Sequence, residues 1–458
     1  MLLRFVVENF RSFRDSTEFN LFPYRKLGKL KHHIQRGSGV DALKLSAIYG
    51  ANASGKSNFI RAIRCVQHYL VKGELPPEIF TEHFRLDADY ARKPTVFGVE
   101  FVAQEQVFLY ALKFDRNRIL GEELYRSGLG DGSDEPIFVF DAQADTVLRF
   151  SDAFYASSKN KLLAELLNES LLKKNRSVLL QLTEIENNAL ADLHTAIEFL
   201  KNGINLITPD TRPTGFLSEL INNTDFLNFT RNIVRSFHVG IQDLKIERIP
   251  LRDYFGENEP EAIRHVLQQL NQNPPLNIQR AEITMRSETG DELVITSDPE
   301  GVFVHRLSFV QKTENEQESV FLIDDQSDGT RRLLDFLPAF LYVLQEKKTV
   351  IIDEIERSLH PILIKQLIQK FSADATTKGQ LIFTTHESNL LDLKIFRRDE
   401  IWFTEKSPTG VSNLYPLSRF QEHHTIDVRR GYLSGRYGAI PFMGNLQDLN
   451  WQEYDTAA

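Results

Sequence analysis

The spacing of hydrophobic and polar residues changes near residue 150. Before that point the apolar residues follow strand patterns, and polar residues at 104–106 separate two of the longest runs. The predicted strands are 2–7, 17–21, at least two between 95 and 124, 137–140 and 146–150. We therefore expect an N-terminal hairpin and an antiparallel sheet that ends near residue 150.

Apolar residues return at helical intervals between 161 and about 237, without the sustained heptads of a long coiled coil. Pro209 and Pro213 interrupt this stretch, so it predicts a compact helical lobe or a short stalk. Strand-like alternation then reappears at 244–249, 281–285, 293–295 and 302–307. The chain is expected to divide into an N-terminal lobe (1–150), a helical insert (151–243), a C-terminal lobe (244–405) and a tail (406–458).

A phosphate-binding loop is predicted between a strand and a helix near residue 50. The residues Gly50-Ala51-Asn52-Ala53-Ser54-Gly55-Lys56-Ser57 match the pattern Gly-x-x-x-x-Gly-Lys-Ser, with an apolar run before them and helical spacing after them. In such loops backbone N–H groups point at phosphates. Lys56 is then expected to reach the β- and γ-phosphate oxygens, and Ser57 to ligate Mg²⁺.

Acidic and small polar residues in the C-terminal half complete this picture. A helix is predicted to begin at Ser327, where backbone N–H groups and the positive end of the helix dipole favour an anion. A buried strand at 349–352 ends in Asp353 and Glu354, at the edge where ligands bind in α/β sheets. Asp353 is expected to hold Mg²⁺, and Glu354 to orient or deprotonate water. A further central strand, 380–385, precedes His386, which would contact the γ-phosphate.

Composition narrows the class of protein. The 458 residues carry a net charge of −9 with a pI near 5.8, which argues against indiscriminate binding to nucleic-acid backbones. The single cysteine, Cys65, excludes an internal disulfide framework and fits a reducing compartment. We expect its side chain to be buried in the helix after the phosphate loop. Neither a signal peptide nor a membrane span is indicated. We expect a cytoplasmic protein.

Six elements in this order resemble the ABC-type ATPase heads of the SMC, Rad50, RecF and OLD-like group, and among them the RloA-like AAA15 ATPases. The resemblance covers nearly the whole chain and rests on the segment 9–13, the phosphate loop, the segment 326–332 (similar to the signature motif), Asp353-Glu354 (Walker B), the segment 358–361 (D-loop) and His386 (switch histidine). It implies an α/β fold, an ABC-type P-loop head with a mixed sheet, an antiparallel β subdomain and an inserted helical lobe.

The resemblance also implies ATP and Mg²⁺ as ligands and a homodimer, or a larger assembly of dimers, that closes around ATP. Each nucleotide would be held by Lys56 and Ser57 of one copy and capped by Ser327 and Gly329 of the other. The catalytic residues would be Glu354, His386 and Lys56, and the metal ligands Ser57 and Asp353. The nucleotide-binding residues would be Arg11, Gly50, Asn52, Ala53, Ser54, Gly55, Lys56, Ser57, Asn58, Ser327, Gly329 and Ser358.

The function implied is an ATP-hydrolysing switch subunit, the sensor or regulator of a prokaryotic anti-phage defence system. About seventy residues follow His386 and contain no well-spaced acidic set, so an effector such as a nuclease would be a separate polypeptide. Two alternatives stay open: a DNA-maintenance ATPase of the RecF kind that binds nucleic acid in its closed dimer, and a scaffold that binds nucleotide without hydrolysing it. Two features depart from the general pattern of ABC ATPases: no glutamine is assignable to the Q-loop, and Asp328 stands where transporters have glycine, as is familiar in the AAA15 group.

Overall fold

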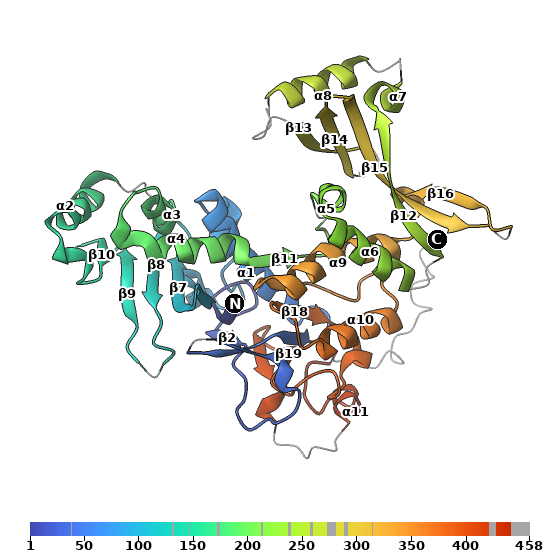
Figure 1. The fold of residues 1–458 in the computed structure, drawn as a ribbon. Coiled ribbons are helices and arrows are strands. Elements are labelled where there is room, and N and C mark those ends of the chain that lie inside the picture. The colour runs from blue at the N-terminus through green and yellow to red at the C-terminus, as the bar shows by residue number, and fades with distance from the viewer. Residues whose placement is uncertain are drawn as a thin grey trace, which may run out of the picture. The chain divides into compact units, whose positions relative to one another are not determined.

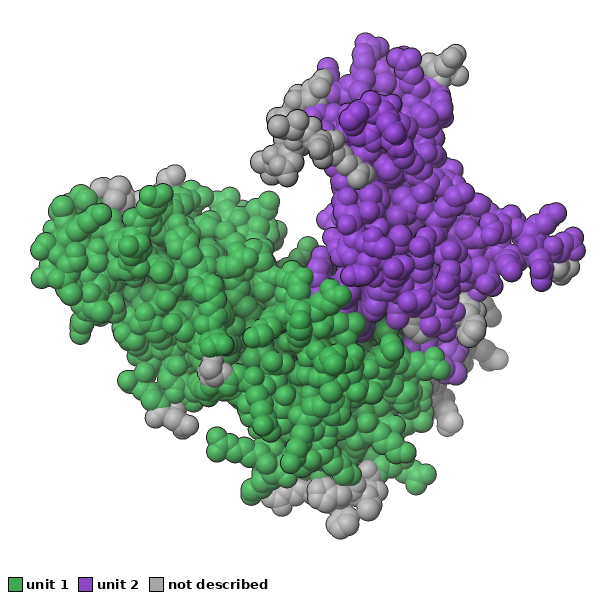
Figure 2. All heavy atoms as spheres, viewed as in Figure 1, with its two compact units in different colours: residues 1–209, 343–356, 365–458 green, residues 210–342, 357–364 purple. Residues whose placement is uncertain are grey.

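A computed structural model describes residues 1–37, 39–130, 132–144, 146–171, 175–211, 214–236, 240–256, 260–272, 281–287, 292–313, 315–420 and 427–440. Pro213 and the tail from 441 onward lie outside the described residues. The chain forms two compact units (Figure 2). The first contains residues 1–209, 343–356 and 365–458, and the second contains residues 210–342 and 357–364.

The first unit contains an antiparallel sheet of seven strands, as the alternation before residue 150 predicts (Figure 1). In spatial order its strands are β10 (Leu148–Phe150), β9 (Glu135–Asp141), β8 (Ile119–Arg126), β7 (Gln106–Phe114), β6 (Thr95–Ala103), β1 (Leu2–Glu8) and β2 (Thr17–Asn20). The predicted N-terminal hairpin pairs Phe5 with Phe19. A separate two-stranded ribbon joins β3 (Ile34–Arg36) to β4 (Asp41–Leu43).

The second sheet of this unit is parallel except at one edge. Its strands are β11 (Ile204–Ile207), β17 (Thr349–Ile352), β18 (Gln380–Thr385), β5 (Leu45–Tyr49), β19 (Ile401–Lys406) and β20 (Ser412–Pro416). Only the β19–β20 pair is antiparallel. The phosphate loop follows β5, which pairs with β18, and β18 pairs in turn with β17. These three parallel strands therefore end side by side. The fold is therefore α/β, with a mixed sheet and an antiparallel sheet, as expected.

The helix α1 (Lys56–Lys72) connects the two sheets through one hydrophobic core. Phe59 on α1 lies 5.5 Å, between ring centroids, from Phe5 on β1 and from Phe19 on β2. Cys65, on the same helix, is buried, and burial raises the pKa of its thiol to about 12. The core packing of α1 fixes where the phosphate loop before it must lie.

Residues 151–243 divide differently from the single helical insert that the pattern predicts. The helices α2 (Ser158–Leu166), α3 (Val178–Thr183) and α4 (Ala191–Glu198) belong to the first unit, and β11 extends its parallel sheet. The buried carboxylate of Glu122 accepts hydrogen bonds from the hydroxyls of Tyr69 and Tyr110 and from the N–H groups that begin α3. A buried acid on β8 thus attaches the helices to the first unit, and no local pattern shows this.

The remaining short helices of the first unit surround these sheets. They are η1 (Lys31–His33), η2 (Pro77–Thr81), η3 (Ala88–Arg92), η4 (Phe154–Ala156), η5 (Leu167–Leu171), η6 (Asn188–Leu190), η7 (Phe199–Gly203), η9 (Ser388–Leu390), η10 (Leu417–Arg419) and α11 (Val428–Leu433). None of the helices in the described part of the chain is long and apolar enough to cross a membrane.

The second unit is built on an antiparallel sheet with helices of its own. Its strands are β12 (Ile241–Pro250), β15 (Gly301–Lys312), β14 (Glu292–Asp298), β13 (Ala281–Arg286) and β16 (Glu318–Leu322), the last paired with β15. Its helices are α5 (Phe216–Asn222), α6 (Thr224–Ser236), α7 (Leu251–Phe255), α8 (Pro260–Gln272) and η8 (Ile323–Asp325). Two helices, α9 (Asp328–Gln345) and α10 (Pro361–Ala373), contain residues of both units.

Candidate nucleotide site

The phosphate loop, residues 50–57, has the tight backbone that its glycines predict. Gly55 has a φ of +123°, which side chains rarely tolerate, and a Cβ there would collide with the side chain of Ser412. A Cβ on Gly50 would lie 2.5 Å from the backbone oxygen of Thr404. Both positions therefore require glycine, one for its φ and both for space.

The β19–β20 hairpin supports this loop from behind. The hydroxyls of Ser412 and Thr404 donate hydrogen bonds to the backbone oxygen of Ser54, at 2.6 and 3.3 Å. The Ser412 N–H also donates to the backbone oxygen of Ser12, at 2.7 Å. Nothing in the local sequence pattern of Ser412 and Thr404 predicts contact with a loop some 350 residues earlier.

Lys56 holds a buried amine at the centre of the site. Its Nζ donates to the backbone oxygens of Gly50 (2.8 Å) and Ala51 (3.1 Å) and lies 3.4 Å from Nδ1 of His386. Burial lowers the pKa of the amine to about 8, although the carboxylates of Glu356, Asp353 and Glu354 act in the opposite direction. Among the described residues, no carboxylate forms an ion pair with Lys56.

The two acidic residues after β17 are held by Thr384 on the neighbouring strand β18. The Thr384 hydroxyl donates to Oδ1 of Asp353 at 2.5 Å and accepts the N–H of Glu354 at 2.8 Å. Glu354 adopts a φ of +52°, an uncommon conformation for a residue with a side chain. Such backbone conformations cluster at functional sites, where the surroundings maintain them.

A third acid, Glu356, completes this cluster, although no motif in the sequence predicts a role for it. Its Oε1 accepts the N–H of His386 at 2.5 Å, and its buried Oε2 has no partner among the described residues. Burial and the nearby Lys56 amine lower the pKa of His386. The imidazole is therefore neutral at pH 7, and the histidine's backbone is fixed by a carboxylate two residues beyond Glu354.

Arg11 lies beside the first turn of α1. Its guanidinium pairs with Glu82 at 2.6 Å and donates to Oδ1 of Asn58 at 3.4 Å, while Asn58 donates to the hydroxyl of Ser12 at 2.8 Å. Arg11 has a φ of +51°. The segment 9–13 is thus tied to the helix that follows the phosphate loop.

The other predicted loop residues differ in exposure. Asn52, Ala53 and Ser57 are exposed, whereas Ser54 is buried. The Ser54 hydroxyl has no hydrogen-bond partner in the described part of the chain. The first unit therefore brings together residues 11, 50–58, 353, 354 and 386 around the ends of three adjacent parallel strands.

The predicted signature residues belong to the second unit. The Ser327 hydroxyl accepts the N–H of Thr330 at 3.2 Å and so caps α9, yet the residue remains exposed. A Cβ on Gly329 would lie 2.7 Å from the backbone oxygen of Ser358, whose own φ is +63°. The exposed Ser327 and Ser358 and the half-buried Gly329 thus form one cluster at the beginning of a helix.

A family model described as "AAA domain, putative AbiEii toxin, Type IV TA system" matches residues 45–392. The chain belongs to this AAA domain family. The match includes the phosphate loop, the acidic strand end and His386. It agrees with the resemblance to P-loop ATPase heads.

Solved structures give weaker likenesses. An SMC head bound to the C-terminal winged-helix domain of ScpA is 13% identical, with a TM-score of 0.41 and coverage of 91% of this chain and 97% of that one. The SMC head from Thermotoga maritima is 13% identical, with a TM-score of 0.37 and coverage of 91% and 98%. An SMC head from Pyrococcus furiosus bound to the C-terminal domain of ScpA is 11% identical, with a TM-score of 0.38 and coverage of 95% and 98%. No curated protein sequence matches, so the assignment to the AAA domain family rests on the family model.

The residues of this AAA domain fit a nucleotide phosphate. A buried ammonium without a carboxylate partner is costly unless an anion accompanies it, and Lys56 lies in a loop whose glycines allow close approach. For Mg²⁺ the chain offers the exposed Ser57 hydroxyl and the Asp353 carboxylate. Two protein ligands are enough for Mg²⁺, because this ion usually completes its coordination with water molecules and phosphate oxygens.

The Q-loop of this AAA domain stays unassigned. Gln104 and Gln106 lie at the β6–β7 turn, as their sequence context predicts, and Gln104 accepts the hydroxyl of Thr195 at 3.3 Å. After α1 the chain instead places Glu82, the partner of Arg11, between η2 and η3.

Proposed function

We propose that this protein is an ATP-hydrolysing switch that closes as a dimer around its nucleotide. The observation that carries the proposal is the buried Lys56 amine, which lacks a carboxylate partner in the described chain and lies beside His386. The carboxylates of Asp353 and Glu354 act on it at longer range. A triphosphate with Mg²⁺ supplies the missing negative charge and an electrophilic phosphorus.

The proposed roles follow from the groups that each residue offers. Lys56 and the loop N–H groups bind the β- and γ-phosphates, while Ser57 and Asp353 ligate Mg²⁺. Glu354 accepts a proton from the attacking water, and neutral His386 donates a hydrogen bond near the γ-phosphate. Arg11 and Asn58 border the nucleotide beside α1.

The groups at the beginning of α9 support closure of the dimer by a second copy of the chain. The exposed Ser327 and Ser358 cluster with the half-buried Gly329 at the positive end of a helix, and such an end favours phosphate oxygens. We propose that this cluster caps the nucleotide held by a partner copy. Loss of the γ-phosphate would then weaken the dimer, which makes hydrolysis a conformational switch.

We propose further that the switch regulates a prokaryotic defence system through a separate effector, in the cytoplasm. The family description, which names a toxin of a toxin–antitoxin system, supports this role. A DNA-maintenance role is the alternative. ATP-dependent DNA binding with a steep dependence on salt would favour the alternative, because neutralised phosphates release counterions. Binding to DNA that ignores ATP would support neither role.

The variant Glu354→Gln tests the catalytic part. We expect phosphate release to fall about 10²- to 10⁴-fold, because the amide cannot accept a proton, while ATP binding persists and the closed dimer accumulates. Lys56→Ala is the matched variant, which should neither bind ATP nor dimerise. Phosphate release and sedimentation with ATP measure both. Unchanged hydrolysis in Glu354→Gln would exclude the proposed base, and no hydrolysis by the parent protein would favour a scaffold.

A further inference from the structure

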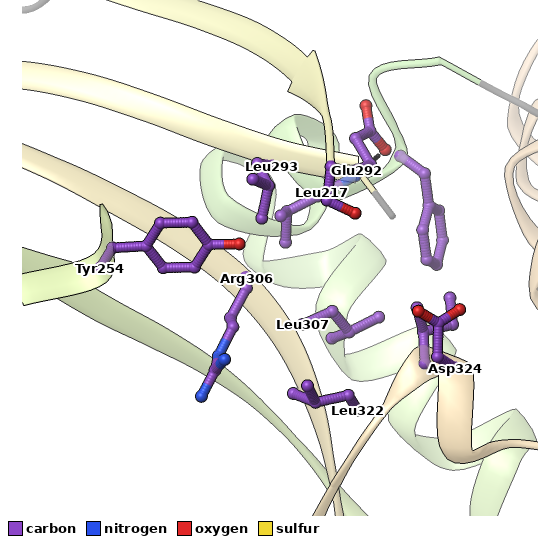
Figure 3. A pocket seen from close by; sticks show the side chains of 11 residues that line it. Leu217, Tyr254, Glu292, Leu293, Arg306, Leu307, Leu322 and Asp324 are labelled. Atoms are coloured by element: carbon purple, nitrogen blue, oxygen red, sulfur yellow. Dashed lines mark hydrogen bonds between the residues drawn. The ribbon is translucent and has the colours of Figure 1, made fainter. Parts of the chain in front are cut away.

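A pocket of about 160 Å³ lies within the second unit, between α5, the sheet strands β14 and β15, and the short helix η8 (Figure 3). Seven of its lining residues are apolar or aromatic: Phe216, Leu217, Tyr254, Leu293, Leu307, Leu322 and Ile323. Four of them, at 216, 217, 293 and 307, are less than 9% exposed. The floor of the pocket is therefore hydrophobic core surface.

The charged lining residues already have partners in the protein. Glu292 accepts the backbone N–H groups of Gly215 and Leu217, and so caps the start of α5. Arg306 donates to Glu247 at 2.5 Å, and Asp324 lies 3.6 Å from the guanidinium of Arg331. An entering molecule would have to break these interactions to pair with a charge, so the pocket favours an uncharged, largely apolar ligand.

Arg331 connects this pocket to the signature segment. It lies on the first turn of α9, donates to the backbone oxygen of Asp324 in the pocket wall, and donates to the backbone oxygen of Gln326 at 3.1 Å. Its own N–H is bonded to the backbone oxygen of Ser327. Three lining residues, Leu322, Ile323 and Asp324, therefore lie within a few residues of the proposed nucleotide cap, and the Arg331 side chain holds Asp324 to it.

We propose that this pocket binds a small uncharged apolar or aromatic molecule and that binding orders the signature segment through Asp324 and Arg331. The volume sets the ligand size, because an apolar cavity of about 150 Å³ accommodates benzene or xenon. The binding site stands on the geometry of the second unit alone. The inference that ligand binding in the pocket regulates dimer closure rests on the proposed function.

The test uses benzene as the probe and the whole chain without nucleotide. Benzene at ten times its Kd should raise the folding equilibrium constant of the second unit about elevenfold, seen as a higher melting temperature. Amide hydrogen exchange at 322–332 should slow at least threefold. Leu322→Phe fills the pocket and should abolish both effects, whereas Val320→Phe, at an exposed position on the same strand, should retain them.

Three results would overturn the proposal. They are no benzene effect on the parent protein, an effect that persists in Leu322→Phe, or stabilisation without slower exchange at 322–332. If Leu322→Phe does not fold, the exchange map of the parent protein still decides, because protection must then cover 215–217 and 306–307 together with 322–332. None of these readouts involves ATP, so failure of the nucleotide proposal would not imitate failure of this one.

Discussion

The starts of two helices, α1 and α9, are both predicted phosphate sites, but they are built in different ways. At α1 the loop is locked by Gly50 and Gly55, braced by Ser412, and contains the buried amine of Lys56. At α9 the capping hydroxyl of Ser327 is occupied by its own helix, and the residue is exposed.

The comparison shows that the α1 site requires an anion to balance its charge, whereas the α9 site does not. The α1 loop has its geometry fixed by neighbours in the same unit and lacks only an anion for its buried charge. At the α9 start the Ser327 hydroxyl caps its own helix and the buried Arg332 lies 3.9 Å from Asp335, so nothing within its own unit demands a ligand. We infer that α1 binds nucleotide in a single copy, whereas α9 contributes only when a nucleotide is presented to it.

The largest contrast is expected between Gly55→Ala and Gly329→Ala. The first substitution strains a φ of +123° and collides with Ser412, so we expect at least 100-fold weaker ATP binding and a loss of about 2–4 kcal/mol of stability. The second brings a Cβ against the backbone oxygen of Ser358 within the second unit, away from the phosphate loop. ATP binding by one copy should therefore change less than twofold, while dimerisation weakens about tenfold. Calorimetric titration and sedimentation measure these effects. Equal loss of ATP binding in both variants would refute the contrast.

A pH effect of about tenfold per unit should be confined to the α1 site. Below pH 8 the Lys56 amine of the free protein is charged and ready to bind phosphate. Above pH 8 it loses its proton and must regain it on binding, so ATP affinity should fall about tenfold per pH unit. Titrations between pH 7 and 9.5 measure this.

Glu356→Gln is the control for this pH effect. It removes a carboxylate that raises the pKa of Lys56, so the bend in the affinity profile should move below pH 8. A profile that is flat to pH 9.5 would show that the amine is not the titrating group.

The smallest loss of stability is expected at the α9 cap. Ser327→Ala removes the acceptor of the Thr330 N–H and should cost about 1 kcal/mol of stability. Ser327→Asp preserves a capping acceptor but adds a negative charge, so stability should be retained while ATP-dependent dimerisation is lost. Thermal melting and sedimentation separate the two outcomes. Dimerisation by Ser327→Asp equal to that of the parent protein would place the cap outside the nucleotide interface.

Local patterns gave most of the elements of the first unit correctly. Alternation before residue 150 predicted the antiparallel strands, and the apolar runs at 349–352 and 380–385 predicted β17 and β18. The strands β11, β19 and β20 were not predicted. These short strands become strands only through their places in the six-stranded sheet. Propensity over four to six residues is a weak signal beside such long-range pairing.

The sequence by itself determined the chemical groups of the candidate nucleotide site and their order, because glycine spacing, Lys56 and the acids at a strand end depend on local geometry. Only the tertiary structure decided that Ser412 and Thr404 brace the loop, that Glu356 holds His386, and that residues 151–243 are shared between two units. These facts depend on hydrogen bonds and packing between residues far apart in the chain. The burial of each side chain and the distances between residues far apart in the chain are set by the whole fold, so local periodicity cannot predict them.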